Sequence, residues 1–187
     1  MIELVNDLLN VSRLELGTFA VNPVDISIVK IAEDICRELS PQIETKHLDF
    51  EKSFDEKLPE KYSADPKLLT MIFQNLLSNA VKYTPEKGKV SLVVKKEKST
   101  ILIKISDTGY GIPKDQQGNI FKKLFRADNV REKDTEGTGL GLYIIKTIVE
   151  TVKGSIWFES EKNKGTTFFV RLNLKGMASK KGEKALT

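Results

Sequence analysis

Residues 75–83 read N-L-L-S-N-A-V-K-Y, and they complete a helical pattern that begins after Asp65. Apolar residues recur at helical spacing from Leu68 to Val81, behind a capping aspartate and a proline in the first turn. The opposite face of this predicted helix carries Asn75, Asn79, Lys82 and Tyr83. Amide oxygens suit Mg²⁺ and a lysine ammonium suits phosphate, so one helix face can serve both groups. A solvated polar face is the alternative for this stretch taken alone.

A second stretch, D-T-G-Y-G-I-P at residues 107–113, follows an alternating run that predicts a strand. Asp107 therefore stands at a strand end, where a buried carboxylate can accept a hydrogen bond from an exocyclic amine such as that of adenine. Gly109 and Gly111 allow the backbone to pass close to such a base. Alternatively, this Asp-Gly sequence is a turn that closes a hairpin.

The third stretch, G-T-G-L-G-L at residues 137–142, opens a predicted helix that runs from about Gly139 to Val152. Glycines before a helix expose free backbone N–H groups to an anion. The spacing is G-x-G-x-G, so neither a P-loop nor a Rossmann site fits. Together, the three stretches predict a nucleotide site that binds ATP.

The remaining pattern predicts an α+β fold, a two-layer sandwich with helices on one face of a sheet. A further helix is expected at about Ile26 to Lys46. The expected strands are Phe19 to Val21, Leu48 to Phe54, Lys61 to Ser63, Val90 to Lys95, Ile101 to Ser106, Ser155 to Ser160 and Thr167 to Leu172. Lys114 to Glu136, which is long and poorly periodic, is expected to be a mobile lid.

Composition agrees with a single cytoplasmic domain. The 187 residues are 40% hydrophobic, enough for one core, and no apolar run is long enough to span a membrane. Cys36 is the only cysteine, which excludes an intramolecular disulfide, and no zinc pattern or signal peptide is present. The net charge of +4 is mild, and no DNA-binding motif favours a nucleic-acid partner.

With I-F-K-K-L-F-R-A-D at residues 120–128 between the second and third stretches, the chain resembles the ATP-binding catalytic domain of sensor histidine kinases. That superfamily also contains gyrase-type topoisomerases, ATP-driven chaperones and mismatch-repair ATPases. The resemblance covers about Phe19 to Leu174 and implies a mixed, mainly antiparallel sheet. In this family the four motifs are called the N, G1, F and G2 boxes. The F box departs from the family at Leu124, where a phenylalanine is usual.

The resemblance implies roles residue by residue. Asn79 would bind Mg²⁺, Asp107 would read the adenine amine, and Lys82 and Arg126 would assist catalysis at the terminal phosphate. Phe121 would anchor the lid. The other residues implied to contact or shape the ATP site are Asn75, Tyr83, Gly109, Gly111, Ile112, Gly137, Thr138, Gly139, Leu140, Gly141, Leu142 and Thr166.

Two features bear on the reaction. Hydrolytic relatives carry a general-base glutamate where this chain has Asn75, and an amide cannot take up a proton near neutral pH. In histidine kinases the acceptor is a histidine on a dimerising hairpin, whereas the only histidine here, His47, is expected in a strand. We therefore expect transfer of the γ-phosphate to a hairpin absent from this chain. The alternatives are a serine-directed kinase, a self-sufficient ATPase and a non-catalytic nucleotide-gated module.

The expected organisation has three parts. Residues 1–17 resemble the end of a dimerisation helix, although an amphipathic helix packed on its own domain is the alternative. Residues 18–174 form the catalytic domain, and residues 175–187 a disordered basic tail. The expected partners are the histidine-bearing hairpin and a response regulator. No membrane contact is expected, and the chain should be a monomer or a weak dimer.

Overall fold

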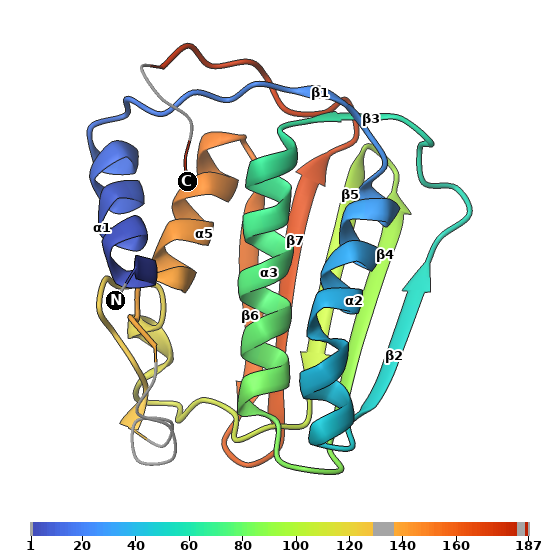
Figure 1. Cartoon of the computed structure of the whole chain (residues 1–187), viewed down its shortest axis with the longest axis vertical. Coiled ribbons are helices and arrows are strands. Elements are labelled where there is room, and N and C mark those ends of the chain that lie inside the picture. Colours follow the sequence, from blue (N-terminus) through green and yellow to red (C-terminus); the bar gives the residue numbers. More distant parts are fainter. Residues whose placement is uncertain (1, 129–136, 183–185, 187) are drawn as a thin grey trace.

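A computed structural model describes residues 2–128, 137–182 and 186, with side chains from Val5 onward. One five-stranded sheet carries the helices on a single face, so the predicted two-layer α+β class is confirmed (Figure 1). The sheet order is β2-β4-β5-β7-β6. The strands are β2 (Asp49–Phe54), β4 (Lys89–Glu97), β5 (Thr100–Asp107), β6 (Ser155–Glu161) and β7 (Gly165–Asn173). Only the β2–β4 pair is parallel among these, so the sheet is mixed and mainly antiparallel.

In the described part of the chain, three helices cover the sheet: α2 (Ile28–Thr45), α3 (Pro66–Tyr83) and α5 (Gly141–Thr151). The central helix α3 buries Leu69, Ile72 and Leu77 completely or nearly so. Alternate residues of β5, among them Ile101 and Ile103, fill the facing side of the core. Strand side chains alternate between the two faces of a sheet. Asp107, the last residue of β5, is an even number of residues from Ile101 and Ile103, so its side chain lies on the same face of the sheet, the face that α3 covers.

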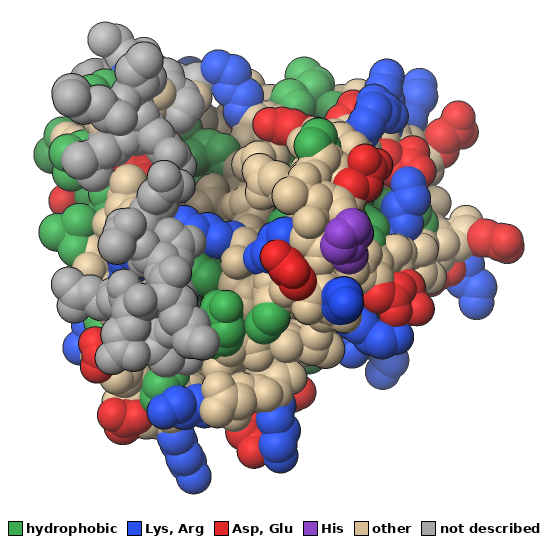
Figure 2. All heavy atoms as spheres, turned by 60° about the horizontal axis from the view of Figure 1, so that its bottom comes forward, with side chains coloured by type: hydrophobic (Ala, Val, Ile, Leu, Met, Phe, Trp, Pro, Cys, Tyr) green, Lys and Arg blue, Asp and Glu red, His purple; other side chains and the backbone are tan. Residues whose placement is uncertain are grey.

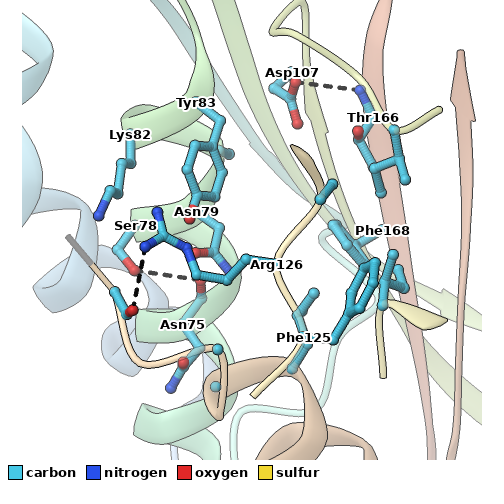
Figure 3. A pocket seen from close by; sticks show the side chains of 18 of the residues that line it. Asn75, Ser78, Asn79, Lys82, Tyr83, Asp107, Phe125, Arg126, Thr166 and Phe168 are labelled. Atoms are coloured by element: carbon cyan, nitrogen blue, oxygen red, sulfur yellow. Dashed lines mark hydrogen bonds between the residues drawn. The ribbon is translucent and has the colours of Figure 1, made fainter. Parts of the chain in front are cut away.

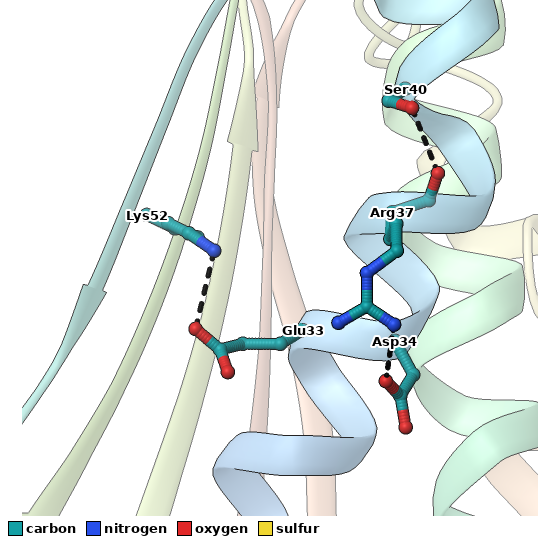
Figure 4. Close-up of polar contacts among 5 residues, drawn as sticks. All are labelled: Glu33, Asp34, Arg37, Ser40 and Lys52. Atoms are coloured by element: carbon teal, nitrogen blue, oxygen red, sulfur yellow. Dashed lines mark hydrogen bonds and ion pairs between the residues drawn. The ribbon is translucent and has the colours of Figure 1, made fainter.

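Helix α2 accommodates an internal proline through a neighbouring hydroxyl (Figure 4). Pro41 has no N–H, which leaves the carbonyl of Arg37 without its usual helical donor. Ser40 Oγ donates to that carbonyl at 2.9 Å. On the sheet side, Lys52 of β2 pairs with Glu33 at 3.3 Å and links the strand to the helix.

The N-terminal helix α1 (Ile2–Glu15) lies beside α5 (Figure 1). Val11 and Leu14 are buried. The chain continues to β1 (Val24–Ile26), which pairs with β3 (Tyr62–Ala64) in a small second sheet. The strand predicted at Phe19 to Val21 is wrong, because that segment forms only isolated bridges, one of them from Val21 to Lys180.

The C-terminal segment corrects a second expectation. Described residues after Leu174 are packed on the domain and do not form a disordered tail. Met177 N–H donates to Ser63 O at 2.8 Å, and Lys180 exchanges backbone hydrogen bonds with Val21. Met177 and Leu186 are both buried in the core. Apolar residues within a basic segment therefore hold it in place.

His47 is an exposed turn residue, visible as the histidine of Figure 2, and the expected strand position is wrong. Its φ of 50° lies in the left-handed region, which bends the chain between α2 and β2. No helix in the described part of the chain is long and apolar enough to cross a membrane.

Candidate functional site

A pocket of about 260 Å³ opens between α3, the end of β5, the start of α5 and the described lid residues. Figure 3 shows side chains of α3 on one side of it and Asp107, Thr166 and Phe168 on the other. The lining residues are Asp7, Asn75, Ser78, Asn79, Ala80, Lys82, Tyr83, Asp107, Gly111, Ile112, Ile120, Phe125, Arg126, Ala127, Gly137, Thr138, Gly139, Gly141, Leu142, Thr166 and Phe168. The three separate sequence stretches thus meet in one cavity.

Helix α3 is held at both ends, which fixes the polar face that it turns to the pocket. At its start, Asp65 Oδ1 accepts from Lys67 N at 3.0 Å and from Leu68 N at 3.4 Å. At its end, Lys46 Nζ donates to the carbonyls of Val81 and Lys82 at 2.8 and 2.9 Å. A cation bound to the last carbonyls of a helix also complements the helix dipole.

Asp107 lies at the opposite side of the pocket from this helix (Figure 3). Its Oδ1 accepts from Gly109 N at 2.8 Å and from Thr166 N at 3.2 Å, and its other oxygen faces the cavity. Burial raises the pKa of Asp107 to about 6, against the opposing effect of those two hydrogen bonds. The free oxygen is therefore a buried acceptor suited to a neutral N–H donor.

The loop after Asp107 needs glycine for a steric reason. Gly111 has a φ of 60°, and a Cβ at this position would lie 1.9 Å from the carbonyl oxygen of Glu161. Any side chain would push the loop away from β6. The neighbouring Ile112 lines the pocket, and Ile112 N donates to Ser160 Oγ at 2.8 Å.

The first residues of α5 approach α3 closely. A Cβ on Gly141 would lie 2.2 Å from Asn75 Oδ1, so the absence of a side chain allows this contact. Within the described residues, no side chain caps the first turn of α5, although Leu140 N donates to Thr138 Oγ1 at 3.2 Å. The remaining N-terminal amides suit an anion entering the pocket.

Two cations stand near this helix start. The Cβ position of Gly137 is 3.7 Å from both Lys82 Nζ and the Arg126 guanidinium carbon. Arg126 also donates to Gly137 O at 3.4 Å. Positive charge and open backbone amides therefore gather at one end of the pocket, while the Asp107 carboxyl lies at the other.

Among the described lid residues, Phe121 packs against the domain. Its ring meets Phe158 of β6 edge to face at 5.9 Å, and Lys146 lies over it at 5.4 Å. Leu124, where the family usually has phenylalanine, is 66% exposed and has a φ of 58°. The rest of the predicted lid, 129–136, lies outside the described residues.

Every predicted site residue lines the pocket except Gly109, Phe121 and Leu140. Gly109 donates its backbone N–H to Asp107, and Phe121 packs against Phe158 of β6. The side chain of Leu140 is only 1% exposed and packs in the core, so only its backbone is available to the pocket. The assigned roles remain predictions.

Sequence reasoning left out several lining residues. Ser78 lies three residues after Asn75, and Phe168 two residues after Thr166, so helical and strand periodicity place each on the same face as a predicted residue. Asp7 of α1 is different, because it reaches Thr138 Oγ1 at 2.7 Å from a distant part of the sequence. No local pattern indicates that contact.

The protein groups of the pocket could hold a Mg²⁺ ion only together with a bound ligand that supplies further oxygen atoms. Within residues 2–128, 137–182 and 186, no three His, Cys, Asp or Glu side chains gather as a metal group. Asn79 offers one amide oxygen at the pocket wall. Mg²⁺ commonly takes one or two protein ligands and completes its shell with phosphates and water, so Asn79 is compatible with that arrangement.

Comparison with known proteins gives concordant matches. Residues 64–176 match the family described as "Histidine kinase-, DNA gyrase B-, and HSP90-like ATPase". The circadian input-output histidine kinase CikA of Synechococcus elongatus is 36% identical over 91% of this chain and 23% of its own length. The sensor histidine kinase WalK of Bacillus subtilis is 36% identical over 94% of this chain and 29% of its own length.

The crystal structure of full-length ShkA in complex with AMPPNP covers 95% of this chain and 36% of ShkA, with a TM-score of 0.80 and 26% identity. The chain therefore spans well under half the length of each of these three proteins. The similarity to these proteins extends over nearly the whole chain, and the family match at residues 64–176 spans the region of the four sequence motifs.

Proposed function

Because the chain belongs to the histidine kinase-, DNA gyrase B- and HSP90-like ATPase family, we propose that it is the ATP-binding catalytic part of a sensor histidine kinase. Its reaction would pass the γ-phosphate of ATP to a histidine on a dimerising hairpin. Relatives named as histidine kinases, including CikA and WalK, support this choice within the broader family.

The observation that carries the proposal is the polarity of the pocket. A carboxyl oxygen of Asp107 faces one end, and Lys82, Arg126 and the amides of α5 surround the other. A nucleoside triphosphate has the same division, with a hydrogen-bonding base and a polyanionic tail. ATP therefore fits with adenine at Asp107 and its phosphates at the start of α5.

Within that arrangement, the residues bind and orient. Asp107 accepts from the adenine amine, while Lys82 and Arg126 offset negative charge on the terminal phosphate. Mg²⁺, when bound beside Asn79, would supply further charge neutralisation across the phosphates.

Asn75 favours transfer over hydrolysis. Its Nδ2 donates to Met71 O at 3.1 Å, and its Oδ1 rests against Gly141. An amide held in this way cannot act as a general base for water. Water would therefore not be activated by this residue, and the phosphate would instead go to a nucleophile supplied by the acceptor, as expected for a histidine on a partner hairpin.

The context of the domain follows from the same proposal. Helix α1 would be the end of the hairpin, residues 18–174 the catalytic domain, and a response regulator the next phosphate acceptor. A domain that consumes ATP would lie in the cytoplasm, where ATP is made. His47 is exposed in a turn, away from any helix that resembles an acceptor hairpin.

Phosphate transfer from labelled ATP to separate histidine-bearing hairpins of several relatives tests the proposal. The wild-type chain should label a hairpin, whereas Asn79→Ala and a hairpin with histidine replaced by alanine should remain unlabelled. Steady phosphate release that is lost in Asn79→Ala, with no hairpin labelled, would instead indicate an ATPase. Nucleotide binding without either reaction would indicate a non-catalytic module.

A further inference from the structure

The base end of the pocket is backed by hydrogen bonds from Ser160, which none of the predicted motifs includes. Ser160 Oγ lies 2.8 Å from Ile112 N, 3.0 Å from Gly165 O and 2.9 Å from Thr166 Oγ1. Gln117 Nε2 donates to Ile112 O at 3.1 Å and to Ser160 O at 2.9 Å. This side chain holds the loop against β6, so the contacts of Ser160 are kept together.

Counting protons fixes the direction of these bonds. A hydroxyl carries one proton and accepts two hydrogen bonds. The carbonyl of Gly165 can only accept, so the proton of Ser160 belongs there. The N–H of Ile112 takes one acceptor position on Ser160 Oγ, and the Thr166 hydroxyl fills the second only by donating. One arrangement therefore satisfies all three contacts, and it directs the Thr166 proton toward Ser160.

This arrangement determines which hydrogen-bonding groups the pocket presents to the base of a nucleotide. Thr166 is 7% exposed and lines the cavity with Asp107. Because the Thr166 hydroxyl donates its proton to Ser160, its oxygen can act toward a ligand only as a hydrogen-bond acceptor. Asp107 Oδ1 already accepts two backbone N–H groups, which leaves its second oxygen for a ligand. The two side chains thus present acceptors together.

We propose that Ser160 is a positioning residue for base selection, because it fixes the Thr166 hydroxyl as an acceptor. The site then favours a purine with an amine at position 6 and rejects a purine with a carbonyl there. A carbonyl would leave buried acceptors unpaired, which is a strong means of discrimination in binding sites. The inference rests on the proposed function, since it requires ATP to enter this pocket by its base.

Calorimetric titration of the full chain with ATP and with inosine triphosphate, which has a carbonyl at position 6, provides the test. In Ser160→Ala the Thr166 proton is free to turn toward the ligand. The ratio of the Kd for inosine triphosphate to the Kd for ATP should then fall by about tenfold, the scale of one hydrogen bond. Adding Thr166→Val should abolish this dependence on Ser160.

Ser106→Ala is the matched control. It removes a similar bond, from Thr167 Oγ1 to Ser106 Oγ at 3.0 Å, one position along β5 and β7 on the other face of the sheet. The Kd ratio should stay within about twofold of wild type.

Equal weakening of both nucleotides by Ser160→Ala, with an unchanged ratio, would overturn the inference and leave Ser160 a merely structural role. Should Ser160→Ala fail to fold, Thr166→Val replaces it, with selective loss of ATP affinity expected and an unchanged ratio contradicting the inference. Wild-type protein that binds neither nucleotide would refute the proposed function itself.

Discussion

At the scale of single residues, Asp107 combines burial with incomplete hydrogen bonding. One oxygen is satisfied by two backbone N–H groups, whereas the other faces the pocket. Desolvation outweighs those bonds, and the pKa rises to about 6. A group arranged in this way costs stability in the free protein and gains a partner when a ligand binds.

This cost predicts a pH dependence. Because the pKa of Asp107 is higher in the folded chain than its ordinary value of 3.8, the folded chain holds more protons between these two pKa values. The unfolding free energy should therefore fall as pH rises from about 4 to about 6, by roughly 3 kcal/mol in total. Urea unfolding of wild type and Asp107→Asn across this range measures the difference, since other carboxyls titrate in both proteins. A difference that stays constant with pH would contradict the prediction.

Gly111 predicts a second residue-scale effect. Gly111→Ala places a Cβ 1.9 Å from Glu161 O in a left-handed backbone, so the loop and β6 must separate. We expect a loss of more than about 2 kcal/mol in unfolding free energy, with weaker ATP binding. Gly118→Ala is the control, because a Cβ there meets no atom within 4 Å. Equal stability of the two variants in urea would be inconsistent with the structure.

Residue chemistry explains which site members the sequence could reveal. Asn79, Asp107 and the glycines were predictable because each belongs to a compact motif with a recognisable chemical role. Asp7 and Ser160 were not, since their contacts join segments far apart in the chain, Asp7 to Thr138 and Ser160 to Ile112. The core position of the Leu140 side chain was not predictable either, because an apolar residue inside a glycine-rich motif can serve the site or the core.

At the scale of elements, periodicity located the helices and large strands, while boundaries depended on local bonds. The helix expected from Ile26 begins at Ile28, because Ser27 is its N-cap and accepts from Lys30 N at 3.2 Å. The short strand near the N-terminus was misplaced by several residues. The observed strand, β1, pairs with β3, and this long-range pairing cannot be predicted from the local sequence pattern.

The end of α3 allows a test at this scale. Lys46→Met keeps the apolar stem but leaves the carbonyls of Val81 and Lys82 without their cationic donor. We expect a loss of about 1–3 kcal/mol in unfolding free energy and weaker ATP binding, since Lys82 occupies this last turn. Lys67→Met, on the exposed first turn of the same helix, should change neither quantity appreciably. Chemical unfolding and calorimetry distinguish the two, and a neutral Lys46→Met would contradict this role.

At the scale of the whole molecule, the two-layer fold brings distant motifs to one pocket. The fold class was predictable from alternating strands and amphipathic helices, and the comparisons agree with it. The packed C-terminal segment was not predictable, because charge and position suggested disorder while Met177 and Leu186 are buried. Long-range contacts of a few apolar residues outweighed local composition.

Helix α1 leads to a prediction about assembly. Val5, Leu8 and Leu9 are about half exposed, while Val11 and Leu14 are buried on the domain. Together with Leu16 just after the helix, these are the exposed large apolar side chains of the described part of this region, and four such side chains cover far less area than the roughly 800 Å² per partner of a stable interface. Sedimentation equilibrium should therefore show a monomer at micromolar concentration, with weak dimerisation at most. A stable dimer at that concentration would contradict this expectation. If Leu8→Ser did not weaken that dimer, the exposed face of α1 would not be its interface either.

Titration of ATP with Mg²⁺ into the wild-type chain and into Asp107→Asn tests the central claim most directly. Wild type should bind with a Kd between micromolar and sub-millimolar, and the substitution should weaken binding by more than about tenfold. Circular dichroism would establish that the variant remains folded. Equal ATP affinity in the two proteins would contradict the assignment of Asp107 to the adenine base, and a folded wild type that binds no ATP would contradict the account as a whole.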